Sequence, residues 1–131
     1  MTITTINLGD AFLLGTDPNG NHLFVAIAPI FNSRYLFVSL TTRRKNSETA
    51  CVLLPTTAGA PSFIKVESVI AYVFAREMDT NELNRAVCAG SRTPYCQFPP
   101  IILNKIQYGG VASMEIEPRF KRALKSFLGI S

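Results

Sequence analysis

Residues 35–44 read YLFVSLTTRR, an apolar run that ends in two hydroxyls and two cations. A segment rich in Tyr, Phe, Val and Leu, without Gly or Pro, is typical of a strand buried on both faces. A rigid strand that ends in hydroxyl and guanidinium groups can hold a phosphate, because Arg offers a planar fork of donors. The same residues also fit a strand end followed by a solvated basic loop, Arg43 to Lys45.

The composition indicates one globular domain over residues 1–131, with 47% hydrophobic and 17% charged residues. No apolar run approaches the roughly 18 residues that suggest a membrane span. The N-terminal MTITTINLGD lacks the cation that precedes the apolar part of a signal peptide. We therefore expect a cytoplasmic protein without a membrane partner.

The three cysteines and the single histidine do not form a metal-binding pattern. Cys51, Cys88 and Cys96 are widely spaced, and one histidine cannot complete the usual zinc set. We expect reduced cysteines, with Cys51 in the core beside Val52 and Leu53. The sequence predicts no metal and no cofactor.

The formal net charge of +4 favours a polyanionic partner, either nucleic acid or an acidic protein segment. The Lys and Arg residues gather at 43–45 and again at 119–125. The excess is modest, and many basic proteins bind neither kind of partner.

Short apolar runs separated by turn residues predict the remaining strands. A first strand within 7–20 and a second over 22–28 are joined by the turn-forming segment 16–21, with 29–34 as a connection into the third strand. Further strands are expected over 50–54, 63–75 and 111–116. Alternation along 63–75 predicts that Lys65 and Glu67 lie on one face, and that Phe74 belongs to the core with Phe12, Phe24 and Phe37.

Two segments have helical periodicity. Asp79 can cap a short helix over 79–89, with Glu82 completing a capping box. Residues 118–128 carry one apolar stripe after Pro118 and end before Gly129, which predicts an amphipathic surface helix. The segment 101–108 fits either a helix or a strand. Together, these strands and helices predict a mainly-β fold with minor α, built as a small antiparallel sheet or a partly open barrel.

The order of segments resembles the MazF/PemK-like family of toxins from bacterial toxin–antitoxin systems. The similar segments are GDAFLL, HLFVAIAP, YLFVSLTT, CVLLP, FIKVESVIAY and FKRALKSFLG, whereas 78–108 does not align. The resemblance implies an SH3-like barrel, a homodimer, a growth-inhibiting endoribonuclease that cuts single-stranded RNA without metal, and an acidic antitoxin protein as partner. Thr41 and Thr42 match the hydroxyl pair of the family. Lys65 and Glu67 lie where the family has an Arg and an acid, and His22 is the nearest candidate for a cation that the second strand lacks.

Cleavage of RNA without metal drives the 2′-hydroxyl onto its own phosphate, which requires a base, an acid and groups that stabilise the developing charge. We expect Glu67 to be the base, with Lys65 beside it. Thr41 and Thr42 would orient the phosphate, Arg43 or Arg44 would neutralise it, and His22 would be the acid. Alternatively, Lys65 and Glu67 form a surface ion pair that contributes little to the stability of the fold.

Two other functions remain open from the sequence. A non-enzymatic SH3-like module would use the same groove to bind nucleic acid or an acidic peptide, and the substitution of Lys65 for Arg favours it. A purely structural dimer would lack any concave basic site around Thr41, Lys65 and Glu67.

Overall fold

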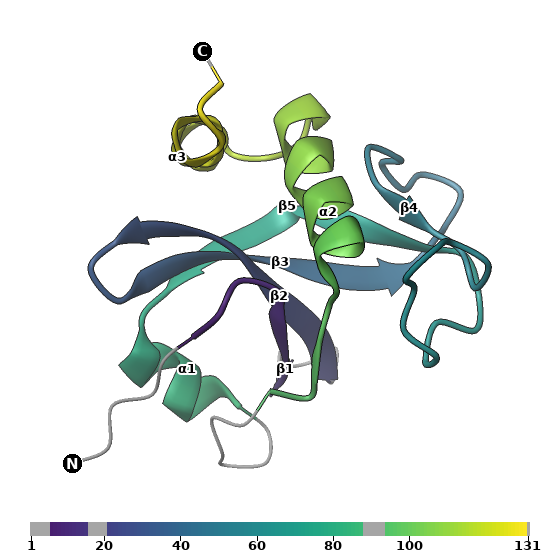
Figure 1. The fold of residues 1–131 in the computed structure, drawn as a ribbon, viewed down its shortest axis with the longest axis horizontal. Coiled ribbons are helices and arrows are strands. Elements are labelled where there is room, and N and C mark those ends of the chain that lie inside the picture. Colours follow the sequence, from purple (N-terminus) through teal and green to yellow (C-terminus); the bar gives the residue numbers. More distant parts are fainter. Residues whose placement is uncertain (1–5, 16–20, 88–93, 131) are drawn as a thin grey trace.

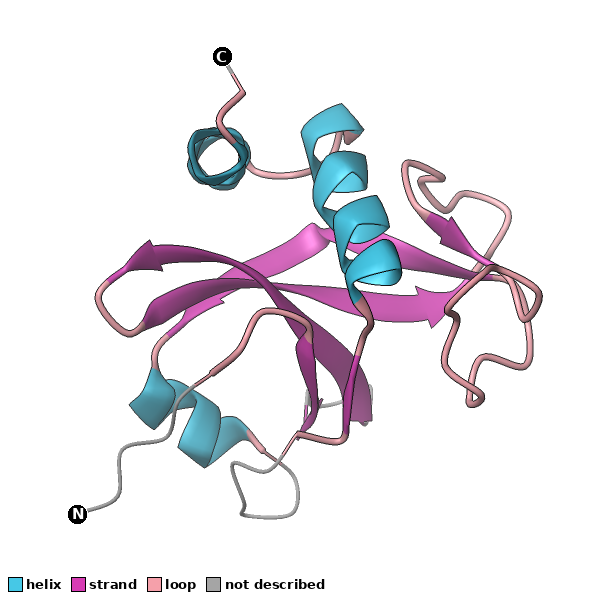
Figure 2. Ribbon diagram, viewed as in Figure 1, coloured by secondary structure: helices cyan, strands magenta, loops and turns pink. Residues whose placement is uncertain are grey.

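The computed structural model describes residues 6–15, 21–87 and 94–130 and shows a curled antiparallel sheet with three helices (Figure 1). The sheet bends into an open half-barrel, and the helices are short (Figure 2). The predicted mainly-β fold with minor α and a partly open antiparallel barrel is therefore confirmed. In the described ranges, no helix combines the length and the apolar character needed to cross a bilayer.

Six strands follow one another in the sheet in the order β4-β5-β3-β2-β1-β6. Their bounds are β1 Asp10–Gly15, β2 Asn21–Phe31, β3 Arg34–Thr42, β4 Val52–Leu53, β5 Ser68–Met78 and β6 Cys96–Gln97. The apolar run that opens the sequence argument is β3, as predicted, and it lies between β5 and β2 with Leu36–Ser39 buried. A strand in this position is covered on both faces, which is why its residues are almost continuously apolar.

Each face of the sheet has its own apolar core. On one face, Val38, Ile70 and Tyr72 pack in the cluster that holds Ile106 of α2 (Pro100–Ala112) and Leu124 of α3 (Pro118–Leu128). On the other face, Phe12, Phe24 and Phe37 pack in the cluster that holds Leu83 of α1 (Thr80–Ala86). Figure 1 shows this arrangement, with α2 and α3 on one side of the sheet and α1 on the other.

Two helices follow their sequence signals. Helix α3 has the predicted bounds, and Gly129 ends it with a left-handed φ of 73°. Helix α1 begins after Asp79, whose carboxylate accepts a hydrogen bond of 2.7 Å from the backbone N–H of Glu82. It ends at Ala86, earlier than expected, and Val87 has left the helix. The last two residues of the predicted segment, 88 and 89, lie outside the described residues.

Helix α2 decides one open prediction and corrects another. It runs from Pro100 to Ala112, so the segment 101–108, which fits either a helix or a strand in the sequence, is helical and continues through Gly109 and Gly110. The predicted strand over 111–116 does not form, because its first two residues are the last turn of this helix. The glycines are tolerated there because they allow close packing: a β-carbon on Gly110 would lie 2.6 Å from Cδ2 of Leu124.

Two strand predictions also need correction or extension. The strand β2 continues through the expected connection as far as Phe31, and Pro29 is accommodated next to a register irregularity. The strand predicted over 63–75 begins only at Ser68 and continues to Met78. Most of the predicted turn, residues 16–20, lies outside the described residues.

Candidate functional site

The end of β3 and the beginning of β5 bring together most of the polar residues singled out in the sequence. Thr41 pairs with Val69, and Thr42 pairs with Ser68. The ladder continues by one further bond, in which the backbone N–H of Arg43 donates to the carbonyl oxygen of Glu67 over 3.0 Å. The guanidinium of Arg43 also forms an ion pair with the carboxylate of Glu67. Antiparallel pairing therefore places the two threonines, Arg43 and Glu67 at one corner of the sheet.

Lys65 and Glu67 do not lie on a strand, contrary to the prediction. Both residues precede β5, so strand alternation does not apply to them, and a turn closed by the bond from Ile64 N–H to the Pro61 carbonyl (3.1 Å) lies just before Lys65. Lys65 is exposed, and the ion partner of Glu67 is Arg43. The bidentate fork that Lys65 lacks is thus supplied from the neighbouring strand end.

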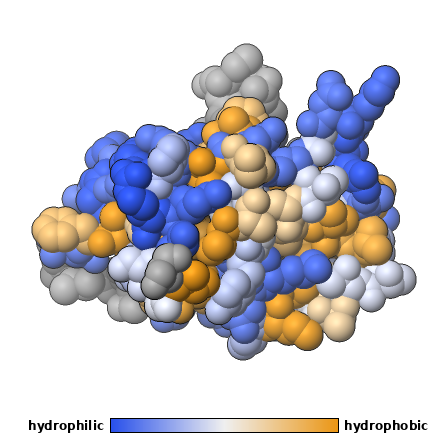
Figure 3. Space-filling view, turned by 90° about the horizontal axis from the view of Figure 1, so that it is seen from above, coloured by the Kyte–Doolittle hydropathy of each residue, from blue (hydrophilic) through white to orange (hydrophobic). Residues whose placement is uncertain are grey.

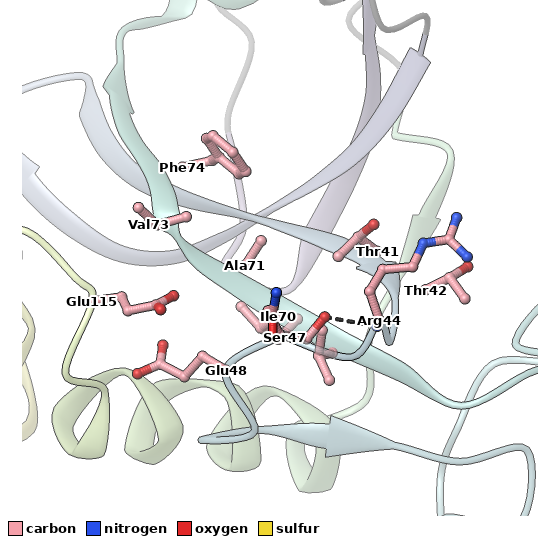
Figure 4. Close-up of a pocket in the computed structure, with 12 residues that line it drawn as sticks. Thr41, Thr42, Arg44, Ser47, Glu48, Ile70, Ala71, Val73, Phe74 and Glu115 are labelled. Atoms are coloured by element: carbon pink, nitrogen blue, oxygen red, sulfur yellow. Dashed lines mark hydrogen bonds between the residues drawn. The ribbon is translucent and has the colours of Figure 1, made fainter.

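A pocket of about 400 Å³ lies next to this corner. Its lining comes from the end of β3, the loop that follows it, the middle of β5 and the link between α2 and α3: Thr41, Thr42, Arg44, Asn46, Ser47, Glu48, Val69, Ile70, Ala71, Val73, Phe74 and Glu115. Figure 4 shows Arg44 and the threonines on one side, Glu48 and Glu115 on the other, and the β5 side chains between them. The pocket therefore has a basic and an acidic side over a largely apolar floor.

Hydrogen bonds hold the loop after β3 in place. The backbone N–H of Arg44 donates to Ser47 Oγ over 2.7 Å, a bond drawn as a dashed line in Figure 4. Further along, the carboxylate of Glu48 accepts bonds from Ser113 Oγ (2.6 Å) and from the backbone N–H of Met114 (2.7 Å). The loop that carries both arginines is thus tied to the link between α2 and α3.

The two threonines are not equivalent. Successive side chains of a strand point to opposite faces, so the hydroxyls of Thr41 and Thr42 diverge (Figure 4). Both are half-buried and border the pocket. The proposed orientation of one phosphate by two adjacent hydroxyls therefore requires that they reach it from different sides.

His22 lies at the same end of the sheet. On β2, His22 pairs with Leu14 of β1. The neighbouring residue Leu23 pairs with Leu40 of β3, so His22 on β2 and Thr41 on β3 are the next residues after this pair, at the same end of the two strands. The described lining of the pocket includes neither His22 nor Lys65. The structure thus joins Thr41, Thr42 and Arg44 in one pocket and Arg43 with Glu67 beside it, whereas His22 and Lys65 do not line the pocket.

Three prominent side chains of the pocket were not singled out from the sequence. Glu48 and Glu115 were not considered as site residues: Glu48 comes from the loop that follows β3, and Glu115 comes from the link between α2 and α3. Phe74 was expected in the core, but 63% of it is exposed, whereas Phe12, Phe24 and Phe37 are buried as expected. No sequence signal marks Phe74, because its exposure depends on an irregularity in strand pairing.

Neither free thiol in the described ranges is poised for catalysis. Cys51 is buried, as predicted, and burial raises the pKa of its thiol to about 11. Burial also raises the pKa of Cys96 to about 11, so both thiols stay protonated near neutral pH. Cys88 lies outside the described residues. Among the residues that the structure describes, no three His, Cys, Asp or Glu side chains gather in a way that could hold a metal ion.

Neither the scan of protein-family models nor the search of curated proteins gives a match to this chain. Membership of the MazF/PemK-like family therefore stays a prediction from the segments quoted above.

Proposed function

We propose that the protein is a metal-independent endoribonuclease of the MazF/PemK-like kind, which cleaves single-stranded RNA at the corner formed by Thr41, Arg43 and Glu67. The observation that carries the proposal is the ion pair between Arg43 and Glu67 beside the threonines. This pair supports the proposal because it brings together a carboxylate, which can act as a base, and a guanidinium, which can bind a phosphate. The net charge of +4 favours approach of a polyanion.

In the proposed reaction, Glu67 accepts the proton of a ribose 2′-hydroxyl. The O2′–P bond forms, the P–O5′ bond breaks, and the leaving 5′-oxygen takes a proton from His22. Arg43 stabilises the charge that develops on the phosphate oxygens, and the products are a 2′,3′-cyclic phosphate and a 5′-hydroxyl. Both members of the Arg43–Glu67 pair are substantially exposed, so the pair is weak and an incoming phosphate can replace the carboxylate on Arg43.

Within this proposal, the protein is a cytoplasmic, growth-inhibiting homodimer, silenced by an acidic antitoxin protein. A negatively charged segment laid across Arg43 and Arg44 would compete with RNA for the same cations. Figure 3 shows that hydrophilic side chains also gather on the side of the molecule where α3 lies, and this helix exposes Arg119 and Arg122.

The first test is cleavage of a long single-stranded RNA in EDTA, with both new ends mapped chemically. The wild-type protein should leave 5′-hydroxyl and cyclic phosphate ends. Glu67→Gln and Arg43→Ala should each lower the cleavage rate by about 100-fold or more, because each removes a group that acts in the transition state.

The chain offers a matched control in the exposed ion pair between Arg119 and Glu117. Glu117→Gln and Arg119→Ala remove the same kinds of groups outside the pocket and should leave the rate unchanged. A folded wild-type protein that leaves varied single-stranded RNAs intact would contradict the nuclease proposal.

The position of Lys65 favours one second candidate, a non-enzymatic module that binds nucleic acid or an acidic peptide. In the family pattern, an Arg and an acid lie together. Here Lys65 takes the position of that Arg, but it is exposed and precedes β5, and the cation that pairs with Glu67 is Arg43. Strongly salt-dependent RNA binding without cleavage would support this candidate.

A further inference from the structure

A bulge in β5 turns Phe74 out of the core and into the pocket. Ser39 pairs with Ala71, and Phe37 pairs with Arg76, so residues 72–75 face the single residue Val38 on β3. Within the bulge, Tyr72 still points inward and donates a hydrogen bond of 2.6 Å to the carbonyl oxygen of Ile106. Phe74 instead lines the pocket with 63% of its surface exposed. Bulges next to functional sites commonly redirect a side chain in this way.

The contents of the pocket match the parts of a nucleotide. Thr41, Thr42 and Arg44 on one side suit a phosphate. The exposed ring of Phe74 and the apolar floor suit the flat face of a base. Glu115 lies on the side opposite Arg44 and the threonines (Figure 4), and its carboxylate suits N–H donors on the edge of a base. The volume of about 400 Å³ lies in the range of roughly 300–1,000 Å³ usual for small-molecule sites.

Glu115 is better suited to this role than Glu48. The two oxygens of Glu48 already accept bonds from Ser113 and Met114. Glu115 is exposed, its backbone N–H is fixed by a bond of 3.0 Å to Ser113 Oγ, and its carboxylate forms no ion pair within the described ranges. A carboxylate accepts readily from the exocyclic amino group of cytosine, whereas uracil presents an oxygen at that position.

We propose that Phe74 and Glu115 form a nucleobase subsite, in which Phe74 stacks on the base and Glu115 accepts a hydrogen bond from its amino group. This inference rests on the proposed single-stranded RNA substrate and adds to it a preference for a base that carries an amino group, such as cytosine. The β5 bulge is then a specificity element, next to the corner proposed for cleavage.

The test is the affinity for fluorescein-labelled decamers of 2′-O-methyl cytidine or 2′-O-methyl uridine, measured by fluorescence anisotropy in EDTA. These decamers have no free 2′-hydroxyl and cannot be cleaved by the proposed route, so binding is measured separately from catalysis. Phe74→Ala should weaken binding of the cytidine decamer by about 10-fold or more, since stacking of a base on an aromatic side chain is worth about 1–3 kcal/mol. Phe74→Tyr, which keeps the ring, should bind like the wild type.

Phe31→Ala is the matched control, because Phe31 is equally exposed (67%) but lies at the opposite end of β3, next to Arg34. It should leave the affinity unchanged. Glu115→Gln should reduce the preference for the cytidine decamer over the uridine decamer by about 10-fold, the size of one base contact. Glu117→Gln should preserve that preference.

The outcomes separate this inference from the nuclease proposal. Binding that depends on Phe74 and Glu115, without cleavage of natural RNA, supports the subsite and contradicts the nuclease. Cleavage with equal affinity in Phe74→Ala and Phe31→Ala overturns the subsite and leaves the nuclease standing. A wild-type protein that binds neither decamer also overturns the subsite.

Discussion

Gly109 lets α2 lie directly on the sheet. A β-carbon at this position would lie 2.5 Å from the hydroxyl oxygen of Tyr72 and 2.8 Å from Cβ of Cys51. The hydroxyl cannot easily move away, because it is buried and bonded to the carbonyl of Ile106. The contact explains why a residue with poor helix propensity stands in the last turns of this helix.

Gly109→Ala should therefore destabilise the fold. The helix would gain about 1 kcal/mol from better propensity, but overpacking of a tight contact costs about 1–3 kcal/mol, so we expect a net loss. The measurement is the free energy of unfolding in urea, followed by circular dichroism.

A double-mutant cycle with Tyr72→Phe tests the cause of that loss. The Tyr72→Phe change removes the oxygen that the new β-carbon would meet, so Gly109→Ala should cost less in that background. An equal cost in both backgrounds would show that the hydroxyl is not what excludes the β-carbon.

At the residue scale, the sequence predicts burial well where a local reason exists. Ser68 interrupts one apolar face of the segment 63–75, which predicts a core hydroxyl bonded to backbone. Its Oγ donates to the carbonyl oxygen of Val66 over 3.0 Å, and the residue is buried. Phe74 could not be predicted in this way, because alternation along 63–75 assumes a regular strand. The bulge that exposes Phe74 depends on how β5 pairs with β3, which lies far away in sequence.

At the scale of elements, the side chain of Glu48 ties the loop between β3 and β4 to the link between α2 and α3. The carboxylate of Glu48 accepts hydrogen bonds from the hydroxyl of Ser113, which is buried, and from the backbone N–H of Met114. Glu48→Ala should lower the free energy of unfolding by about 1–3 kcal/mol, because these donors lose their acceptor. Hydrogen exchange of residues 43–50 should become faster.

Glu48→Gln is the graded comparison, since its amide oxygen replaces one of the two acceptors. We expect an intermediate loss of stability and an intermediate increase in exchange. Unchanged exchange in Glu48→Ala would show that the loop is held by its local bonds, such as the one between Arg44 and Ser47, and not by the link between the helices.

Elements with a local signal were predicted best. The stripe, the initial Pro118 and the terminal Gly129 specify α3 completely, and the apolar run specifies β3. The sequence left 101–108 open between a helix and a strand and did not extend a helix past Gly109 and Gly110, because glycine weakens a helix interior. The reason for their presence is the surface against which they pack. The juxtaposition of Arg43 with Glu67 likewise follows from the pairing of β3 with β5 and not from their own neighbours in sequence.

At the scale of the whole molecule, a charged network connects the helices on the two faces of the sheet. Glu77 on β5 is bonded to Arg34 at the start of β3 and to Arg119 on α3. Arg34 also bonds Asp79, the residue that caps α1. Glu77 is the centre of this network and the least exposed of its members, with 16% of its side chain accessible.

This network predicts a specific dependence of stability on pH. The hydrogen bond from Arg34, together with the charges of Arg34 and Arg119, lowers the pKa of Glu77. A carboxyl with a lower pKa in the folded state stabilises the protein above its unfolded pKa of about 4.3, and this contribution disappears as the pH falls through the folded value. Glu77→Gln should therefore lower the urea midpoint at pH 7, and the gap from the wild type should narrow toward pH 3.

Glu117→Gln is the control for this series, because Glu117 also pairs with Arg119 but is about half exposed. Its midpoint should stay close to that of the wild type at every pH. A gap between Glu77→Gln and the wild type that is as wide at pH 3 as at pH 7 would mean that Glu77 stabilises the molecule by packing. In that case, packing contacts through the sheet would couple α1 to α3, and the ion pairs of Glu77 would not.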